Sequence, residues 1–184
     1  MTLISLVVGI ELVNESNATA YFPTYLIKNN HLDQTTAAYC LAMLSTATTI
    51  GRCVNIFLTM KIGIQTFLFI NFGLMIAANL LIKFTNSLYG VYAGMVLLGF
   101  GFSNSYPMML ALVEERITMS DRTMSLLNFT GAFFLVISPI TVGYFLDSNP
   151  SNYMLFTVAI TLVSLAIYSV LVVLESRRMR SRFK

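Results

Sequence analysis

Six apolar segments, each close to the length that crosses a lipid bilayer, follow one another along the chain with only short polar links between them. The hydrocarbon core of a bilayer is about 30 Å thick and needs roughly 20 apolar helical residues to span it. Strands of a membrane barrel would be shorter and would alternate between apolar and polar residues, which these segments do not. Charged residues form only 10% of the chain, against about 25% in soluble domains. The sequence therefore predicts an all-α polytopic membrane protein.

The links between the segments are short, so consecutive helices should lie side by side and antiparallel in a compact bundle. We place this bundle in residues 1–174 and a basic cytoplasmic tail in residues 175–184. The six predicted membrane spans are residues 2–27, 36–60, 66–82, 88–113, 123–146 and 153–174.

Lysine and arginine predict the orientation of the bundle, because cytoplasmic loops are enriched in both. With a cytoplasmic N-terminus, only Lys28 and Lys83 fall on the outer side. The inner side then holds Arg52, Lys61, Arg116, Arg122, Arg177, Arg178, Arg180, Arg182 and Lys184. We therefore expect both termini in the cytoplasm, in a multi-pass protein of the plasma membrane. The net charge of +3 is then a sign of topology rather than of a nucleic-acid partner.

The first span carries a polar stretch, Gly9–Tyr25, where a membrane helix should be most apolar. A glutamate at the centre of a spanning helix costs about 2.5–3.5 kcal/mol to insert. When residues are placed about 100° apart, one half of the helix surface holds Glu11, Asn14, Asn17, Tyr21, Thr24 and Tyr25, with Glu15 at its border. Such a face predicts the lining of a water-filled path for a solute.

Two other interpretations of this stretch stay open. In one, Glu11 and Glu15 pair with basic side chains and only hold helices together. Arg52 is the one such side chain inside a predicted span, and it should lie near the inner surface. In the other, the helix stops at Val13, and the two Asn-X-Ser/Thr sequons that follow lie in an outer loop as glycosylation sites. The second interpretation leaves an odd number of spans and puts the termini on opposite sides.

The first and fourth spans share a pattern, in which a polar or glycine-rich interruption precedes an aromatic residue and a proline. In the first span Tyr21 comes shortly before Pro23, and in the fourth the run from Gly99 to Tyr106 ends at Pro107. Three helices apart, these spans cross the membrane in opposite directions, as in an inverted three-plus-three repeat. Matching interrupted helices indicate a transport site. The prolines are expected to bend their helices.

Known catalytic and metal-binding motifs do not occur in the sequence. It has no HExxH, no phosphate-binding GxxxxGK[ST] loop, no serine hydrolase set, no NPA repeat and no potassium-channel filter. His31 stands alone in a polar link, so no metal site can be built around it. Cys40 and Cys53 lie on one apolar helix that holds them apart, which predicts free thiols. We expect neither an enzyme nor a cofactor.

Six helices with polar first and fourth members resemble the C-terminal half of a major facilitator superfamily transporter. Residues 9–11 (Gly-Ile-Glu) and 21–25 (Tyr-Phe-Pro-Thr-Tyr) are similar to the seventh helix of sodium-dependent glucose transporter 1-like proteins, a branch related to fucose permeases. Residues 51–52 and 61–63 resemble the basic motif between helices eight and nine, and residues 98–107 resemble helix ten. The similarity covers nearly the whole chain.

This resemblance implies secondary transport of a small solute by alternating access, with a monosaccharide such as glucose as the solute and Na⁺ or H⁺ as the coupling ion. It implies that the first and fourth spans line the central cavity, with gating or structural roles for Pro23, Arg52 and Pro107. Carboxylate and amide groups suit sugar hydroxyls, and aromatic faces suit the sugar ring. The expected solute- and ion-binding residues are Glu11, Asn14, Glu15, Asn17, Tyr21, Asn104 and Tyr106.

The family resembled has twelve helices, whereas six are predicted here. Half a bundle offers half a cavity, so we expect it to pair in the bilayer with an N-terminal six-helix half or a second copy. Two alternatives remain for the function. The chain is a truncated, non-transporting membrane protein or assembly partner, or it transports an organic solute other than a sugar, since one fold hosts many substrates.

Overall fold

The structure, a computed structural model, describes residues 2–85, 87–114 and 120–182, with the side chains of residues 5–85, 87–112, 114 and 120–173. Helices make up nearly all of the described chain, which contains no strand, and the predicted all-α class is confirmed. The helices are α1 (Thr2–Asn30), α2 (Gln34–Thr59), α3 (Ile64–Phe84), α4 (Leu88–Phe102), α5 (Ser105–Glu114), α6 (Asp121–Ser148) and α7 (Pro150–Arg182).

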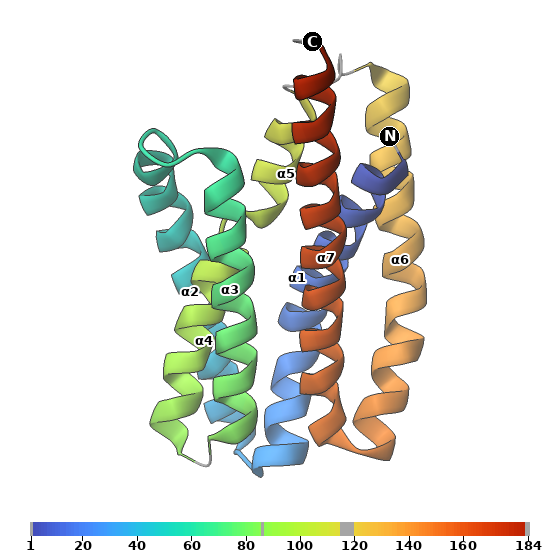
Figure 1. Cartoon of the computed structure of the whole chain (residues 1–184). Helices are drawn as coiled ribbons and strands as arrows, with labels where there is room; N and C mark the ends of the chain where they lie inside the picture. The colour runs from blue at the N-terminus through green and yellow to red at the C-terminus, as the bar shows by residue number, and fades with distance from the viewer. Residues whose placement is uncertain (1, 86, 115–119, 183–184) are drawn as a thin grey trace.

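Five stretches of the described chain are long and apolar enough to cross a membrane, which makes the chain a multi-pass membrane protein. They are Gln34–Thr59, Ile64–Phe84, Leu88–Leu112, Asp121–Ser148 and Pro150–Val173. With 29 residues, α1 is also long enough, but it is not one of the five, because its carboxylates and asparagines interrupt the apolar sequence. It still runs along the bundle against α6 and α7 (Figure 1). Packing rather than hydropathy therefore places α1 among the spans.

The helices pack as an inverted repeat, with α1–α3 as one unit and α4–α7 as the other. The contacts of α1 with α6 and of α2 with α4 are among the three most extensive in the bundle. They are equivalent when α1 corresponds to α4–α5, α2 to α6 and α3 to α7. The contacts of α1 with α7 and of α4 with α3 are equivalent in the same way. Figure 1 shows α1 and α4 running in opposite directions, so the predicted inverted three-plus-three arrangement is confirmed.

Within the fourth predicted span, residues 88–113, the helix is interrupted. Ser103 and Asn104 separate α4 from α5. The interruption lies one turn before Pro107, whose ring nitrogen cannot donate the usual hydrogen bond to the Ser103 carbonyl. Pro23 has a milder effect, because α1 continues over it to Asn30. An α1 that ends at Val13, with an outer loop after it, is therefore wrong.

Glycine lets α4 approach α2 closely near the interruption. A Cβ atom on Gly99 would lie 2.6 Å from the Leu44 carbonyl oxygen and 2.7 Å from the Ala47 Cβ. A Cβ atom on Gly51 of α2 would lie 2.7 Å from the Ser103 Cβ. Glycine at both positions therefore lets the two backbones cross without a side chain between them.

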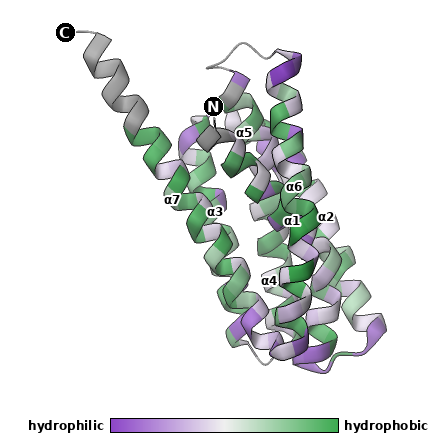
Figure 2. Ribbon diagram, turned by 90° about the vertical axis from the view of Figure 1, so that its right-hand side faces the viewer, coloured by the Kyte–Doolittle hydropathy of each residue, from purple (hydrophilic) through white to green (hydrophobic). Residues whose placement is uncertain are grey.

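The outer surface of the bundle is apolar in its middle and polar at its ends. Helix α6 exposes Phe129, Val136, Ile140 and Tyr144, each at 69% or more of its full area. Figure 2 shows hydrophilic residues gathered at the ends of the bundle, with hydrophobic ones along the helices between them. This distribution suits a surface that faces lipid tails along its length and water at both ends.

The link between α1 and α2 reverses the chain in three residues. His31 adopts a left-handed backbone conformation, with φ of 52°. Asp33 then caps α2, because its Oδ2 accepts a hydrogen bond from the Thr35 backbone N–H at 3.2 Å. Hydrogen bonds from the side chain and the backbone N–H of Thr35 lower the pKa of the exposed Asp33 carboxyl below its usual value.

Candidate functional site

Most of the polar face of α1 is turned into the six-helix bundle. Glu11 and Asn14 each expose 1% of their area and Asn17 exposes 3%. They lie where α1 meets α6 and α7. We use the name α1–α7 seam for the contact that these three residues make with Tyr153, Thr161 and Ser164 of α7.

Hydrogen bonds join the seam at two levels. The Asn14 side-chain amide donates to the Thr161 hydroxyl oxygen at 3.0 Å. One turn further along α1, the Tyr153 hydroxyl donates to the Asn17 carbonyl at 3.1 Å. The Ser138 hydroxyl of α6 donates to Asn17 Oδ1 at 2.6 Å, so Asn17 contacts both neighbouring helices. These bonds hold α1 in a fixed position against α6 and α7.

Glu11 lies at the third level of the seam, and its carboxyl group is in a different situation. Among the described residues, neither of its oxygens makes a hydrogen bond. The Ser164 hydroxyl lies beside this carboxyl group. No hydrogen bond of acceptable geometry joins the two, and within the described part of the chain the Ser164 hydroxyl has no other hydrogen-bond partner. The Glu11 carboxyl group and the Ser164 hydroxyl are therefore neighbours in the buried seam.

Glu15 has a more open position, one helical turn from Glu11. Its Oε1 accepts a hydrogen bond from Arg52 Nη2 of α2 at 3.2 Å, and the two form an ion pair. The Glu15 side chain exposes 26% of its area and the Arg52 side chain exposes 53%. Glu15 lies near the middle of α1. The bundle therefore carries a half-exposed ion pair at the depth of its membrane-spanning helices.

Arg52 also connects this ion pair to the interruption between α4 and α5. Its Nε–H donates to the Ser103 carbonyl at 3.1 Å. This is the carbonyl that receives no helical hydrogen bond from Pro107, because proline has no backbone N–H. Asn55, almost one turn further along α2, donates its side-chain amide to the Ser103 hydroxyl at 2.5 Å. Side chains of α2 thus satisfy the polar groups that the interrupted helix leaves open.

Of the remaining predicted residues, all but Pro107 are partly buried. Asn104 lies in the interruption itself, and Tyr106 follows in the first turn of α5. Tyr21 and Tyr106 both pack against the apolar core. Of the two prolines, Pro23 is partly buried in α1 and Pro107 is exposed.

The structure therefore divides the predicted residues into two groups. Glu11, Asn14 and Asn17 lie in the closed seam, and their contact with a solute stays a prediction. Glu15 and Arg52 come together in the more open group, beside the interruption that contains Asn104. Sequence reasoning did not single out Ser138, Tyr153, Thr161 or Ser164. For α7 a signal existed, because Thr157, Thr161, Ser164 and Tyr168 follow one another at helical spacing in an apolar sequence.

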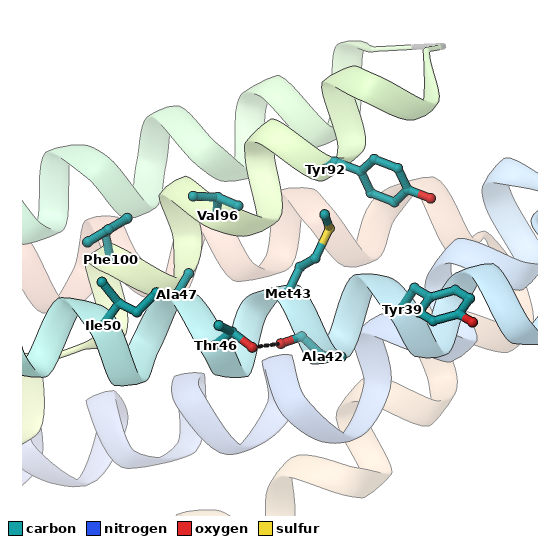
Figure 3. A pocket seen from close by; sticks show the side chains of 9 residues that line it. All are labelled: Tyr39, Ala42, Met43, Thr46, Ala47, Ile50, Tyr92, Val96 and Phe100. Atoms are coloured by element: carbon teal, nitrogen blue, oxygen red, sulfur yellow. Dashed lines mark hydrogen bonds between the residues drawn. The ribbon is translucent and has the colours of Figure 1, made fainter.

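Two grooves on the bundle surface are lined by other residues. One, of about 500 Å³, lies between α2 and α4 and is shown in Figure 3. Met43, Ile50, Val96 and Phe100 line it, and the Thr46 hydroxyl is turned inward to the Ala42 carbonyl. The other, of about 320 Å³, lies between α1, α6 and α7 and is also apolar. Neither groove includes a predicted site residue.

The described residues include no group of three or more His, Cys, Asp and Glu side chains that could hold a metal ion. Cys40 is buried and Cys53 is exposed, and both are free thiols. The prediction of unpaired cysteines is confirmed.

Comparisons with known proteins agree with this architecture. The model of the Major Facilitator Superfamily matches the chain over residues 4–184. The major facilitator superfamily domain-containing protein 4A of Xenopus tropicalis is 29% identical over 153 residues. That alignment covers 82% of the present chain and 30% of the frog protein.

Proposed function

The chain belongs to the Major Facilitator Superfamily, a family of membrane transporters, and we propose that it forms the C-terminal six-helix half of a secondary transporter for a small organic solute. The half bundle has the packing of an inverted repeat with an interruption in α4–α5. Interrupted helices near the repeat interface are where transporters bind their solutes.

The half-exposed ion pair of Glu15 and Arg52 is the observation that carries this proposal. A charged pair turned toward lipid tails would be costly, so charged residues within spans face the bundle interior or a water-filled cavity. The apolar outer face of α6 has the opposite character. The side of the bundle that carries Glu15 and Arg52 is therefore the side that we assign to the solute path.

The residues predicted to bind the solute suit a polyhydroxylated molecule. Glu15 accepts hydrogen bonds and Arg52 donates them, while Asn104 can do both. Tyr21 and Tyr106 add aromatic faces, which favour the C–H surface of a sugar ring. We assign a monosaccharide such as glucose as the solute, and an organic solute other than a sugar is the alternative. The coupling ion is Na⁺ or H⁺.

In this proposal Asn14 and Asn17 position α1 rather than bind the solute directly. Their side chains already bond to Thr161 and Ser138 in the seam. Binding at Glu15 would thus be transmitted to α6 and α7 through a firmly held α1. Pro107 keeps the Ser103 carbonyl open for Arg52, so it has a structural role in the same site.

A complete solute path needs a second wall. The chain spans 30% of the length of the frog relative, and we propose an N-terminal six-helix half or a second copy as the partner. The first residues of α1 and the last residues of α7 lie at the same end of the bundle (Figure 1). The excess of Lys and Arg in the links and tail on that side supports a cytoplasmic position for both termini.

Uptake into proteoliposomes tests this function. The complete transporter that contains this chain is reconstituted and offered labelled hexoses, amino acids and organic acids in turn. We expect uptake of a hexose, and its loss to background in Glu15→Gln and in Arg52→Gln. Lys28→Gln is the matched control, because it removes an ion pair with Asp147 at the end of the same helix.

The outcomes separate the proposals. Unchanged hexose uptake by both Glu15→Gln and Arg52→Gln removes the ion pair from the solute path. Uptake of a different class of solute keeps the transport function and changes the substrate. No uptake of any solute, together with co-purification of the chain with a longer relative, favours a non-transporting assembly partner.

A further inference from the structure

One side of α7 is turned away from the bundle over the length of its membrane span. Val163, Val170 and Val173 lie on this side, and each exposes 49–53% of its area. On the opposite side of the helix, Thr161 and Tyr168 are fully buried. We use the name outward face of α7 for the side that carries the three valines. In a bilayer such an apolar face meets lipid tails.

Arginine continues the outward face beyond the span. Helix α7 runs without a break to Arg182, past the span that ends at Val173. Residues four or seven apart on a helix share a face. Arg177 stands four residues after Val173 and seven after Val170. Arg180 stands seven residues after Val173. The helical register therefore places both arginines in line with the exposed valines.

The length of α7 puts these arginines at the depth of lipid headgroups. The span Pro150–Val173 has 24 residues and covers about 36 Å at roughly 1.5 Å per residue. Arg177 comes one turn later, at about 42 Å from the start of the helix. A bilayer with its headgroups is about 40–45 Å thick. With Pro150 at one surface, Arg177 reaches the headgroup layer of the opposite leaflet.

The net positive charge of the chain is concentrated in the same segment. In the links at the other end of the bundle, two lysines are balanced by two aspartates: Lys28 and Lys83 against Asp33 and Asp147. In the links and helix ends near the arginines, three basic residues are balanced by three acidic ones: Lys61, Arg116 and Arg122 against Glu114, Glu115 and Asp121. Residues 175–184 hold five basic residues and one acidic residue. The excess that gives the chain its charge of +3 therefore lies at the end of α7.

We propose that the outward face of α7 and the arginines that follow it bind an anionic phospholipid, of the class of phosphatidylserine. The acyl chains pack along Val170 and Val173, and the phosphate and carboxylate groups bind Arg177 and Arg180. Guanidinium groups form charge-assisted hydrogen bonds with both kinds of anion. Each basic residue near an anionic membrane surface raises the affinity about fivefold. This binding needs only the inserted helix and does not depend on transport.

Charge favours a lipid over a second copy of the chain as the occupant of this face. Two copies in one membrane share their orientation, so a symmetric contact brings equal depths of both outward faces together. Arg177 and Arg180 of one copy would then approach the same residues of the other, and like charges repel. An anionic headgroup neutralises these arginines instead.

Tryptophan fluorescence measures lipid binding at this face, because the chain contains no tryptophan of its own. Val173→Trp places a reporter one turn before Arg177. Leu155→Trp is the matched control, since Leu155 exposes 46% of its area and lies five helical turns earlier on the same face, in the other leaflet. The purified full chain is reconstituted in mixed bilayers of phosphatidylcholine and phosphatidylserine. One lipid at a time carries brominated acyl chains, which quench a neighbouring tryptophan, and the two series give the relative binding constant.

We expect Val173→Trp to report a preference for phosphatidylserine of about fivefold or more, and Leu155→Trp to report none. Adding Arg177→Gln and Arg180→Gln should lower the preference at Val173→Trp to that of the control. NaCl at about 1 M should weaken the preference without any substitution in the arginines, since salt screens exposed charges.

A second pair of substitutions separates a site from the general charge of the surface. Lys61→Gln with Arg122→Gln removes two positive charges at the same end of the bundle, from side chains that are exposed. The preference at Val173→Trp should survive this change. If it falls as far as it does without Arg177 and Arg180, the charge of the whole surface attracts the lipid and the proposed site is overturned.

Two further results would overturn the inference. One is a preference at Val173→Trp that is absent or that survives the loss of both arginines. The other is quenching at Leu155→Trp by both brominated lipids and at Val173→Trp by neither, because protein then covers the outward face. All of these results leave the transport proposal intact, since that proposal depends on Glu15 and Arg52.

Discussion

Arg52 donates its Nε–H to the backbone carbonyl of Ser103 at 3.1 Å, at the point where α4 ends. Pro107 stands four residues after Ser103 and cannot supply the N–H that a continuous helix would provide. A guanidinium from α2 therefore replaces a helical hydrogen bond. The same side chain reaches Glu15 of α1, so one residue links three helices around the proposed solute path.

Arg52→Ala should destabilise the protein more than Glu15→Gln. Loss of Arg52 leaves the Ser103 carbonyl unsatisfied, which costs about 1–3 kcal/mol. Loss of the Glu15 charge removes only a half-exposed ion pair, worth less than about 1 kcal/mol. The free energy of unfolding, measured by denaturant titration in detergent micelles, checks this order. Equal losses in the two variants would show that the contact with Ser103 contributes nothing.

The crossing of α2 and α4 predicts opposite effects for two glycine substitutions. Gly99→Ala places a methyl group against the Leu44 carbonyl and the Thr48 nitrogen, and backbone atoms cannot yield easily. We expect it to lower the unfolding free energy by about 1–3 kcal/mol. Gly73→Ala in α3 meets nothing within 4 Å and should raise it by roughly 0.5–1 kcal/mol through helix propensity.

Thermal unfolding of both glycine variants in the same detergent provides the comparison. A Gly99→Ala protein as stable as Gly73→Ala would contradict the close approach of the two helices.

The bond between Asn14 and Thr161 predicts the effect of an isosteric change. Thr161→Val removes the hydroxyl and leaves the buried Asn14 amide without an acceptor, which should cost about 1–2 kcal/mol. Thr46→Val is the control, since the Thr46 hydroxyl bonds only to its own helix on an exposed face. In the double variant Asn14→Leu/Thr161→Val both partners are apolar, and part of the stability should return. The same denaturant titration measures all three, and no recovery in the double variant would argue against the pairing.

The cap of α2 predicts a pH dependence at one end of the bundle. The pKa of Asp33 is lowered in the folded protein, so its contribution to stability is present above the unfolded pKa. That contribution is lost as the pH falls through the lower, folded pKa. Amide hydrogen exchange in the first turn of α2 should therefore speed up, relative to the rest of the helix, in that acidic range. Asp33→Asn keeps a capping oxygen without the charge, and its profile should be flat by comparison.

Much of the fold follows from local properties of the sequence. Length and hydropathy predict the spans after the first, because a helix that faces lipid must be apolar over a fixed length. The echo between Tyr21-Phe22-Pro23 and Tyr106-Pro107 indicates the inverted repeat. Proline at 107 accounts for an interrupted helix, although the interruption itself lies one turn earlier, where the Ser103 carbonyl lost its donor.

The candidate site depended far less on local properties. Helical spacing placed Glu11, Asn14 and Asn17 on one face of α1, which is correct. Spacing cannot say whether such a face meets water or another helix. The answer lies with Thr161 and Ser164, about 150 residues away.

The sequence by itself determined that this chain is a helical membrane protein with a polar first helix, since insertion into lipid depends on each helix separately. Only the tertiary structure divided the polar residues of that helix. It enclosed Glu11 beside Ser164 and left Glu15 half open beside Arg52. The physical reason is that burial and pairing arise from contacts between helices, and residues four apart on α1 meet different neighbours.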